Sequence, residues 1–464
     1  MNAIRVQAPT IVIGLLAIEF CLFIGSFYVG AAFSWIDFSG SANQLAWFMP
    51  RAMLYAGSLS VCMYALGLYR RDCLFHGSVV LPRALVAFLC ALIIYAMSWY
   101  SLHFGIWRAV LGYAMPLSLV CVIGLRSVAR EFLDQDTFKR GVAVIGTSKR
   151  AARLEALEAS PYSGFKIVGF IKANQGEEVR VSQERLIKPG NSFLDLLRDH
   201  AVDSLVITTN TREEVPDRQL VESRLAGVRI FDYETFHALE SGRVDLDHLE
   251  PDWFLVESGF HGAISYRLFK RVVDCLLSSA LFVLTLPLLA LAALAIWLED
   301  RGPVIYRQRR VGLRGEVFSL FKLRSMNIAA EDDGLPQWST KQDGRVTRVG
   351  RIIRRLRVDE IPQLINILRG EMSFVGPRPE RPYFVERLAQ ENSFYLDRHS
   401  VKPGLTGWAQ VNFAYGSSAG DARRKLEYDL FYIKYGDVLL DIVVILQTVR
   451  VVLWPQSVER SEWA

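Results

Sequence analysis

The sequence predicts a membrane protein of mixed α and α/β class. We expect a four-helix transmembrane unit over residues 1–127, a Rossmann-like α/β domain over 140–250, a re-entrant membrane helix over 268–300 and a small, mostly helical α+β domain over 301–464. Three observations predict this organisation. Apolar residues make up 51% of the 464 residues and are concentrated near the N-terminus. Short apolar runs alternate with helical patterns in the middle of the chain. A further long apolar run has basic residues on both sides.

The charge and the cysteine usage narrow the class of partner. The net charge of +5 is modest, and the basic residues cluster beside apolar segments. This favours a membrane surface or anionic lipid over nucleic acid. Most of the six Cys lie inside apolar runs, without a C-x-x-C or Cys/His metal spacing, and the seven His are scattered. We therefore expect neither a disulfide framework nor a zinc site.

Four apolar stretches in the first quarter are each near the roughly 20 residues that cross a bilayer as a helix. They are residues 11–33, 47–69, 79–101 and 106–125. Arg70 follows the second stretch, Arg126 and Arg130 follow the fourth, and the loop at 34–46 has no Lys or Arg. The positive-inside rule therefore puts both ends of this unit in the cytoplasm. The pattern does not assign a role to Glu19, which lies inside the first stretch.

The middle of the chain predicts a parallel α/β sheet. Strands are expected at 141–146, 166–171, 205–208 and 228–231, with helical patterns at 151–159 and 193–200. The stretch GVAVIGTSKRA occupies the place of a dinucleotide fingerprint but lacks its glycines, because Gly146 is followed by Thr147 and Ser148. A structural or dimer-forming role is therefore expected more than nucleotide binding.

The apolar run at 275–297 is long enough to span a bilayer, yet basic residues precede and follow it. These are Arg267, Lys270 and Arg271 before the run, and Arg301, Arg307, Arg309 and Arg310 after it. Both ends are therefore expected on the cytoplasmic side. Pro287, at the midpoint, would bend the helix. We predict a helix that enters one leaflet and returns, anchored by an i,i+4 ion pair of Lys270 with Asp274. A fifth transmembrane helix is the alternative.

The most chemically suggestive stretch is LRVDEIPQLINILRGEMSFVGPRP, residues 356–379. Asp359 and Glu360 are adjacent carboxylates that follow several arginines. Pro362 and Gly370 bound a short apolar helix pattern, so the acids are expected at a helix N-terminus. The GPRP turn would hold Arg378 in a fixed direction. The plain alternative is a helix-capping Asp beside a solvated Glu.

Further basic segments surround this stretch. A strand pair carrying Arg307, Gln308, Arg309 and Arg310 is followed by Lys322 and Arg324. A polar loop at 327–345 and a basic amphipathic helix at 347–357 come next. The loop KPGLTGWAQV, residues 402–411, offers Lys402 and backbone N–H groups to phosphate, although such a loop is more often only a turn. The apolar segment at 428–454 is expected to pack on the domain or lie in the membrane interface.

Five motifs in this order resemble the bacterial sugar transferase family, the monotopic phosphoglycosyl transferases. They are KRVVD, YRQRRVG, FKLRSM, DEIPQLINILRGEMSFVGPRP and KPGLTGWAQV. The resemblance covers about residues 268–464, and the N-terminal parts resemble the large form of the family, including undecaprenyl-phosphate glucose phosphotransferases of exopolysaccharide and exosortase-associated operons. The family often has Ser-Pro at the helix break, where this chain has Leu286-Pro287.

The resemblance implies transfer of a hexose-1-phosphate, expected from UDP-glucose, to undecaprenyl phosphate with release of UMP. It implies Asp359 as a nucleophile that forms an aspartyl-phosphosugar. Mg²⁺, held by Glu360 and the substrate phosphates, is expected to neutralise the repulsion between this carboxylate and the diphosphate. The candidate phosphate-binding residues are Arg354, Arg357 and Arg378, with Lys322, Arg324 and Lys402 as weaker candidates. The expected location is the bacterial inner membrane, multi-pass, with a cytoplasmic catalytic domain and a homodimer.

Two other functions remain open at this stage. One is a catalytically silent scaffold for polysaccharide assembly, and the other is a membrane nucleotide-sugar dehydratase. The dehydratase would need an intact glycine fingerprint, which the middle domain lacks, and the complete set of charged motifs speaks against the scaffold. The sequence does not distinguish glucose from galactose or from an N-acetylated amino sugar.

Overall fold

The computed structural model describes most of the chain as two compact units, Asn2–Ser241 and Gly242–Ala464, each of which is described by itself. The described residues are 10–34, 42–69, 77–102, 108–132, 139–160, 163–174, 176–187, 202–209, 217–249, 264–327, 344–413 and 419–453. The helix expected at 193–200 and most of the polar loop expected at 327–345 lie outside these residues.

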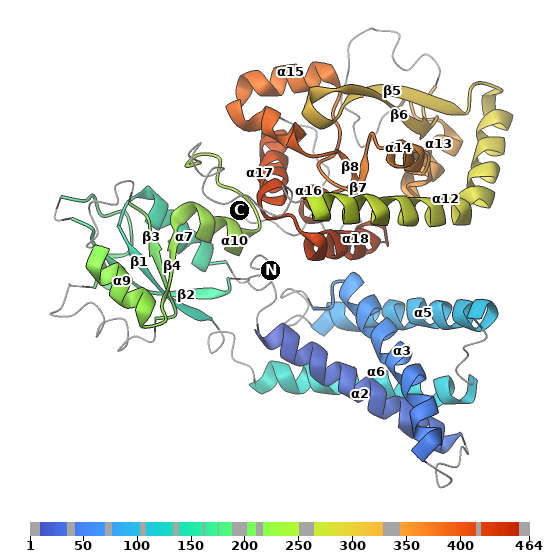
Figure 1. Ribbon diagram of the computed structural model, residues 1–464, viewed down its shortest axis with the longest axis horizontal. Helices are drawn as coiled ribbons and strands as arrows, with labels where there is room; N and C mark the ends of the chain where they lie inside the picture. Colours follow the sequence, from blue (N-terminus) through green and yellow to red (C-terminus); the bar gives the residue numbers. More distant parts are fainter. Residues whose placement is uncertain are drawn as a thin grey trace. The chain divides into compact units, whose positions relative to one another are not determined.

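The first unit begins with four helices (blue to turquoise in Figure 1), at the places where the sequence predicts apolar segments. They are α2 (Thr10–Phe33), α3 (Ala42–Ala65), α5 (Gly77–Leu102) and α6 (Arg108–Phe132). Helix α2 packs against α6 and α3, and α3 packs against α5. Among the described residues of this unit, α2 and α6 are long and apolar enough to cross a bilayer, and α5 contains a shorter apolar stretch. A transmembrane role for all four helices stays a prediction.

A buried ion pair joins α2 to α6 and gives Glu19 a structural role. Arg126 donates from Nε to Glu19 Oε1 at 2.8 Å and from Nη1 to the carbonyl of Leu68 at 2.7 Å. The hydroxyl of Tyr69 donates to Glu19 Oε2 at 2.6 Å. Both charged side chains are almost fully buried, and buried charges are tolerated only when they are paired in this way. Arg126 therefore does not simply flank the membrane, as the sequence suggested, because it lies inside the helix packing.

The second part of this unit is the predicted parallel sheet, which the structure confirms. Its strands are β1 (Arg140–Ile145), β2 (Phe165–Ile171), β3 (Ser204–Ile207) and β4 (Arg229–Asp232), in the order β2-β1-β3-β4. Helices α7 (Lys149–Glu158), α9 (Asp217–Leu225) and α10 (Tyr233–Ser241) accompany them. Val142, Val144, Phe165, Phe170 and Phe236 share one buried core, which explains the short apolar runs in the sequence.

The turn that follows β1 is closed by the chain itself. Gly146 has φ of 112° and no space for a β-carbon, because the Thr208 hydroxyl lies against it. The carboxylate of Glu177 accepts hydrogen bonds from the N–H of Thr147 at 2.6 Å and from the N–H of Ala173 at 3.1 Å. In nucleotide-binding α/β folds, N–H groups at this edge of the sheet face a phosphate. Here they face an internal carboxylate.

The second unit begins with α12 (Ile264–Asp300), a helix of 37 residues that contains Pro287. Figure 1 shows that α12 turns sharply, so that its later part rises along the edge of this unit. A proline removes one helical hydrogen bond, and Thr285 Oγ1 also donates back to the Leu281 carbonyl at 2.7 Å; both features bend helices. A straight helix of this length would extend about 55 Å. The bend instead lets both arms contact the same domain.

The contacts of the first arm correct one expectation. Lys270 does not pair with Asp274, because its Nζ donates to Asp441 Oδ2 at 2.6 Å on another helix. Asp274 accepts the backbone N–H of Phe374 at 2.9 Å instead. Arg271 donates to the carbonyls of Ile367 at 2.5 Å and Leu368 at 2.7 Å. The first arm is therefore fastened to the domain by long-range contacts and not by an ion pair within the helix.

The rest of the unit is a small α+β domain with two short sheets. Its strands are the antiparallel pair β5 (Ile305–Val311) and β6 (Val317–Leu323) and the parallel pair β7 (Ser373–Val375) and β8 (Gly404–Thr406). Its helices are η4 (Leu313–Gly315), α13 (Arg348–Arg355), η5 (Val358–Glu360), α14 (Gln363–Arg369), α15 (Pro382–Glu391), η6 (Ser393–Ser400), α16 (Trp408–Asn412), α17 (Ala419–Tyr435) and α18 (Val438–Leu453). This arrangement agrees with the predicted strand pair and helices.

Two core clusters position the central segment of this domain on α12. Ala292 and Ile296 of the later arm pack with Ile353 and Val358. Buried residues of α14 pack with β6, and Leu281 and Phe282 of α12 cover that cluster. Val358 immediately precedes the predicted acid pair, so the bent helix fixes the place where that pair lies.

Candidate active site

The acid pair lies in η5, a single 3₁₀ turn between α13 and α14. Arg357, before the turn, adopts a left-handed backbone conformation with φ of 58°, which redirects the chain after α13. Pro362 then precedes α14, and Gly370 ends it with φ of 86°. The predicted short helix with its proline and glycine boundaries is therefore present. The acids lie in the turn that leads into this helix and not in its own first turn, as the sequence suggested.

The two adjacent carboxylates have different surroundings. Glu360 Oε1 accepts a hydrogen bond from Arg378 Nη2 at 2.5 Å and pairs with Lys322 Nζ at 3.4 Å. Asp359 is only 7% exposed. Within the described part of the chain, burial and charged neighbours act on its carboxylate, with no hydrogen bond among these influences. A buried carboxylate that accepts no hydrogen bond from the described residues is uncommon, and its oxygens are available to react.

The electrostatics follow this difference. Burial and the neighbouring charge of Glu360 raise the pKa of Asp359 from 3.8 to about 6, against the opposing effect of Lys322, Arg354 and Arg357. Burial alone would raise the pKa of Glu360, but Arg378 and Lys322 outweigh it and hold that pKa well below its usual value. Glu360 is therefore ionised at any physiological pH, whereas Asp359 titrates close to neutrality.

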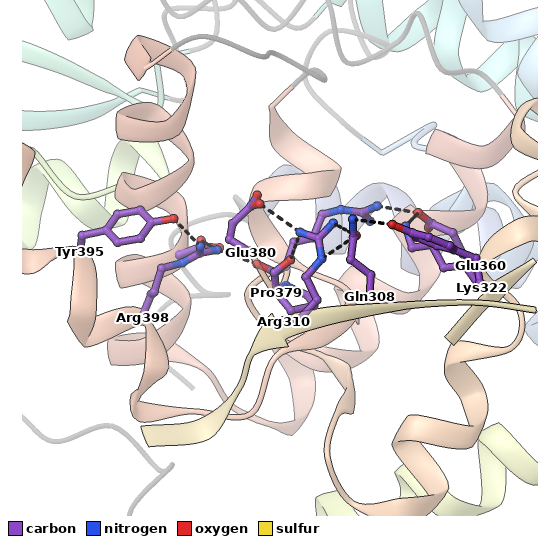
Figure 2. A network of polar contacts seen from close by, with 11 residues as sticks. Gln308, Arg310, Lys322, Glu360, Pro379, Glu380, Tyr395 and Arg398 are labelled. Carbon is purple, nitrogen blue, oxygen red and sulfur yellow. Dashed lines mark hydrogen bonds and ion pairs between the residues drawn. The ribbon is translucent and has the colours of Figure 1, made fainter. Parts of the chain in front are cut away.

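The main chain of the GPRP turn is held by arginine side chains from outside the turn, whereas the direction that its prolines give to Arg378 stays a prediction. Arg398 Nη2 donates to the carbonyl of Arg378 at 2.8 Å, and Arg310 Nη1 donates to the next carbonyl, that of Pro379, at 2.9 Å. Figure 2 shows the surroundings of this turn, with Tyr395 and Arg398 at one end, Arg310 beside Glu380, Pro379 and Gln308 in the middle, and Glu360 with Lys322 at the other end. Two guanidinium groups from different elements thus hold two consecutive carbonyls.

Sequence reasoning missed three residues of this network: Arg310 as a support of the turn, Arg398 and Asp429. Arg398 is buried, and it donates to Asp429 Oδ2 at 2.9 Å and to the Tyr395 hydroxyl at 2.8 Å. Arg310 also contacts Gln308, with Nη2 to Oε1 at 2.6 Å. The local spacing of Tyr395 and Arg398 was the only available signal, since the other partners are far away in the sequence.

The remaining candidates divide into two groups. Arg354 and Arg357 lie close enough to Asp359 to lower its pKa, and Lys322 contacts Glu360 directly. Arg324 instead forms an ion pair with Asp300 at the end of α12, where it fastens the later arm. Lys402 lies beside Arg271 at Gly370, the opposite end of α14 from the acid pair. The structure therefore does not place Arg324 or Lys402 with Asp359.

The described side chains supply too few ligands for a divalent cation unless a bound substrate adds its phosphate oxygens. Among the described residues, no group of three His, Cys, Asp or Glu side chains could hold a metal ion. Glu360 uses Oε1 for both of its cations, and Oε2 has no hydrogen-bond partner among the described residues. Mg²⁺ is commonly bound by one or two carboxylates together with substrate phosphates. Glu360 Oε2 could therefore hold Mg²⁺ when a diphosphate supplies the other ligands.

Comparison with known proteins assigns the family. Residues 265–455 match the bacterial sugar transferase family. A UDP-glucose:undecaprenyl-phosphate glucose-1-phosphate transferase of Escherichia coli is 32% identical over 352 residues, 74% of each chain, and one of Klebsiella pneumoniae is 32% identical over 332 residues, 70% of each chain. The chain therefore belongs to the bacterial sugar transferase family, as predicted.

The name of a third relative specifies a different sugar. This UDP-N-acetylgalactosamine-undecaprenyl-phosphate N-acetylgalactosaminephosphotransferase of Aeromonas hydrophila is 39% identical over 239 residues, which is 51% of this chain. The match spans only 55% of the length of that relative. The predicted enzyme class, a sugar-1-phosphate transferase, agrees with the names of all three relatives, while the names differ in the sugar.

Proposed function

From its membership of this family, we propose that the protein transfers a hexose-1-phosphate from a UDP-sugar to undecaprenyl phosphate and releases UMP. UDP-glucose is the proposed donor, because relatives that match about three quarters of the chain carry glucose in their names. The reaction would be the first membrane step in the synthesis of an exopolysaccharide or a related glycan. The expected homodimer stays a prediction.

The observation that supports this proposal is that the two adjacent acids have different surroundings. Asp359 is buried and accepts no hydrogen bond from the described residues, whereas Glu360 is held by Arg378 and Lys322. A carboxylate can attack phosphorus when nearby cations reduce its repulsion from the diphosphate. Arg354, Arg357 and Lys322 supply positive charge next to Asp359. The geometry thus supports Asp359 as the nucleophile.

In the first step, a carboxylate oxygen of Asp359 attacks the phosphorus that bears the sugar. A new P–O bond forms to Asp359 while the bond to the bridging oxygen breaks, and UMP leaves with that electron pair. The main chain of Arg378 is held in place, so its guanidinium can stabilise the negative charge that develops on the phosphate groups without having to move. The product of this step is an aspartyl-phosphosugar.

In the second step, an oxygen of undecaprenyl phosphate attacks the same phosphorus. The bond to Asp359 breaks and the carboxylate is regenerated, which gives undecaprenyl diphosphate hexose. A lipid phosphate that is already ionised needs no proton transfer to attack, so this step requires no additional general base. When bound at Glu360, Mg²⁺ would neutralise charge on the diphosphate.

The bent helix supports the proposed membrane placement. Both arms of α12 are fastened to one domain, the first through Arg271 and the later through Asp300 and Ile296. Many of its apolar side chains are exposed, among them Leu276, Val283, Leu284, Leu291 and Leu294. A straight span would place its ends about 55 Å apart on opposite faces of a bilayer. We infer that α12 is re-entrant and that the catalytic domain faces the cytoplasm of the inner membrane.

The proposed function is tested by UMP release from the purified full chain in detergent. UDP-glucose, UDP-galactose and their N-acetylated counterparts are each supplied with undecaprenyl phosphate, with and without Mg²⁺. The proposal predicts release that depends on the lipid, on Mg²⁺ and on one preferred UDP-sugar. The proposal is wrong if no UDP-sugar yields UMP under any of these conditions, because a scaffold protein would give that result.

A further inference from the structure

Two positively charged side chains converge at the end of α14 that lies away from the acid pair. A β-carbon placed on Gly370 would lie 3.6 Å from Arg271 Nη2 and 3.7 Å from Lys402 Nζ. The main chain around Lys402 is pinned, because Ser373 N donates to the Pro403 carbonyl at 2.9 Å and Gly404 N donates to the Pro377 carbonyl at 2.9 Å. The convergence is therefore built into the β7–β8 pairing.

Neither cation forms a hydrogen bond or an ion pair with a carboxylate among the described residues. Arg271 donates to two carbonyls at the end of α14, which leaves its charge uncompensated by a carboxylate. Lys402 forms no hydrogen bond or ion pair within the described part of the chain. Asp274 attracts Lys402 electrostatically, but its carboxylate accepts its hydrogen bond from the N–H of Phe374 at 2.9 Å. Burial and the charge of Arg271 lower the pKa of Lys402, so the two groups repel each other as the structure stands.

The pair lies where α12 becomes continuously apolar. Arg271 is four residues before Cys275, the start of the apolar run, and Phe269, Val272 and Leu276 around it are exposed. In the proposed membrane placement, this boundary lies at the depth of the lipid headgroups. Asp359 lies beyond the other end of α14, so the pair is separate from the catalytic acid.

We propose that Arg271 and Lys402 bind the phosphate group of a membrane lipid at the point where α12 enters the bilayer. The inference rests on the proposed membrane placement and adds a second phosphate site to the domain. Two adjacent cations bind a phosphate oxygen strongly because charge-assisted hydrogen bonds form at low local dielectric. The lipid is either the polyprenyl phosphate substrate or a bulk anionic phospholipid, since both present a phosphate at this depth.

A purely structural role for Lys402 makes a different prediction. Cations near a helix C-terminus are stabilised by the helix dipole. Arg271 already donates to the last carbonyls of α14, whereas Lys402 donates to none of them. A structural Lys402 would affect the thermal stability of the domain and leave lipid binding unchanged.

The test compares Lys402→Met with Arg267→Met in the full chain. The control removes one positive charge from an exposed position on the first turn of α12, so it reports the general effect of charge at the membrane. Both variants and the wild type are placed in nanodiscs of phosphatidylcholine with either undecaprenyl phosphate or phosphatidylglycerol. Native mass spectrometry measures how much of each lipid is retained, and this readout needs no turnover.

The proposal predicts that Lys402→Met retains about fivefold less phosphate lipid than the wild type, while Arg267→Met and Lys402→Arg stay close to wild type. Loss confined to undecaprenyl phosphate identifies the substrate, with a matching rise in its KM and an unchanged KM for the UDP-sugar. Loss of phosphatidylglycerol identifies a bulk lipid. Unchanged retention of both lipids in Lys402→Met overturns the proposal, including when that variant is less stable to heat. If the wild type releases no UMP, the proposed function fails, but the retention measurement still decides this site.

Discussion

The α/β domain and the C-terminal domain each hold a carboxylate at a place where phosphate chemistry could occur, and the surroundings of the two carboxylates are opposite in kind. In the α/β domain, Glu177 is bonded to the N–H groups of Thr147 and Ala173. In the C-terminal domain, Asp359 accepts no hydrogen bond from the described residues. The carboxylate of Glu177 therefore stabilises the fold, whereas the carboxylate of Asp359 is buried without a hydrogen-bond donor from the described residues.

This difference separates a structural site from a reactive one. A carboxylate that is bonded to backbone N–H groups, like Glu177, occupies the space that a ligand would need. An unsatisfied one has a raised pKa and costs stability, as is common for groups that are kept reactive. Glu360, beside Asp359, shows both tendencies: its side chain is only 13% exposed, but two cations hold it. Substitutions at these positions should therefore change activity and stability in different proportions.

The largest effect is expected at the nucleophile. Asp359→Asn should lower UMP release by at least about 10⁴-fold, because an amide oxygen cannot form the aspartyl-phosphosugar. Glu178→Gln, which alters an exposed side chain of the α/β domain, serves as the control with normal activity. A purified Asp359→Asn protein with near-normal turnover would show that Asp359 is not the nucleophile.

The next effect is expected at Arg378. Arg378→Ala should lower kcat by about 10²–10³-fold, because it removes a preorganised cation from Glu360 and from the transferring phosphate. Arg387→Ala is the matched control, since Arg387 forms an exposed i,i+4 pair with Glu391. Circular dichroism should show that both variants are folded. Equal rates for the two variants would show that Arg378 has no part in the reaction.

The pH dependence should reveal the raised pKa of Asp359. Only the ionised carboxylate can attack, and the pKa is about 6. The value of kcat/KM for the UDP-sugar should therefore rise about tenfold per pH unit below pH 6 and level off above it. This ratio reports the first step alone, before the lipid phosphate takes part. A profile that stays flat down to pH 4 would contradict the raised pKa.

A smaller effect is expected where Arg398 positions Arg378. Arg398→Lys keeps the charge but loses the planar fork that reaches the Arg378 carbonyl and Asp429 together. We expect kcat to fall about tenfold with little change in the KM for the UDP-sugar, because orientation and not binding is affected. Arg387→Lys should leave both constants unchanged. A loss of stability without a change in kcat would reduce Arg398 to a purely structural residue.

The smallest effects concern stability, and their signs should be opposite. Glu177→Gln places an amide N–H₂ against a backbone N–H and should lower the free energy of unfolding by about 1–2 kcal/mol without affecting UMP release. The pKa of Asp359 is higher in the folded than in the unfolded protein. The free energy of unfolding therefore falls as the pH rises from about 4 to 6, because the folded protein then has to ionise this buried carboxyl. Asp359→Asn should therefore raise the stability at pH 7, by about 1–3 kcal/mol. Thermal unfolding of the two variants checks both signs.

Much of the fold follows from local patterns in the sequence. Buried parallel strands are nearly continuous apolar runs, so β1 to β4 were located to within one or two residues. The proline at the middle of α12 predicted its bend, and Pro362 and Gly370 predicted the limits of α14. The acid pair and Arg378 could be found because they lie within one short stretch.

The rest could not be predicted because it depends on partners far apart in the chain. The spacing rule for helices suggested Asp274 as the partner of Lys270, but the actual partner is Asp441. Arg398 meets Asp429, and Arg324 meets Asp300, with no local pattern to mark either pair. Periodicity describes one element at a time, whereas these contacts are set by how elements pack. Lys402 was expected near the acid pair for the same reason.

The central claim is that Asp359 carries the phosphosugar, and mass spectrometry tests it most directly. The wild-type chain is incubated with UDP-glucose in the absence of undecaprenyl phosphate, quenched and digested. The peptide that contains Asp359 should gain the mass of one hexose phosphate, the adduct should disappear when undecaprenyl phosphate is added, and Asp359→Asn should never acquire it. Stoichiometric transfer to the lipid without any adduct on this peptide, or with the adduct on another residue, would contradict the claim.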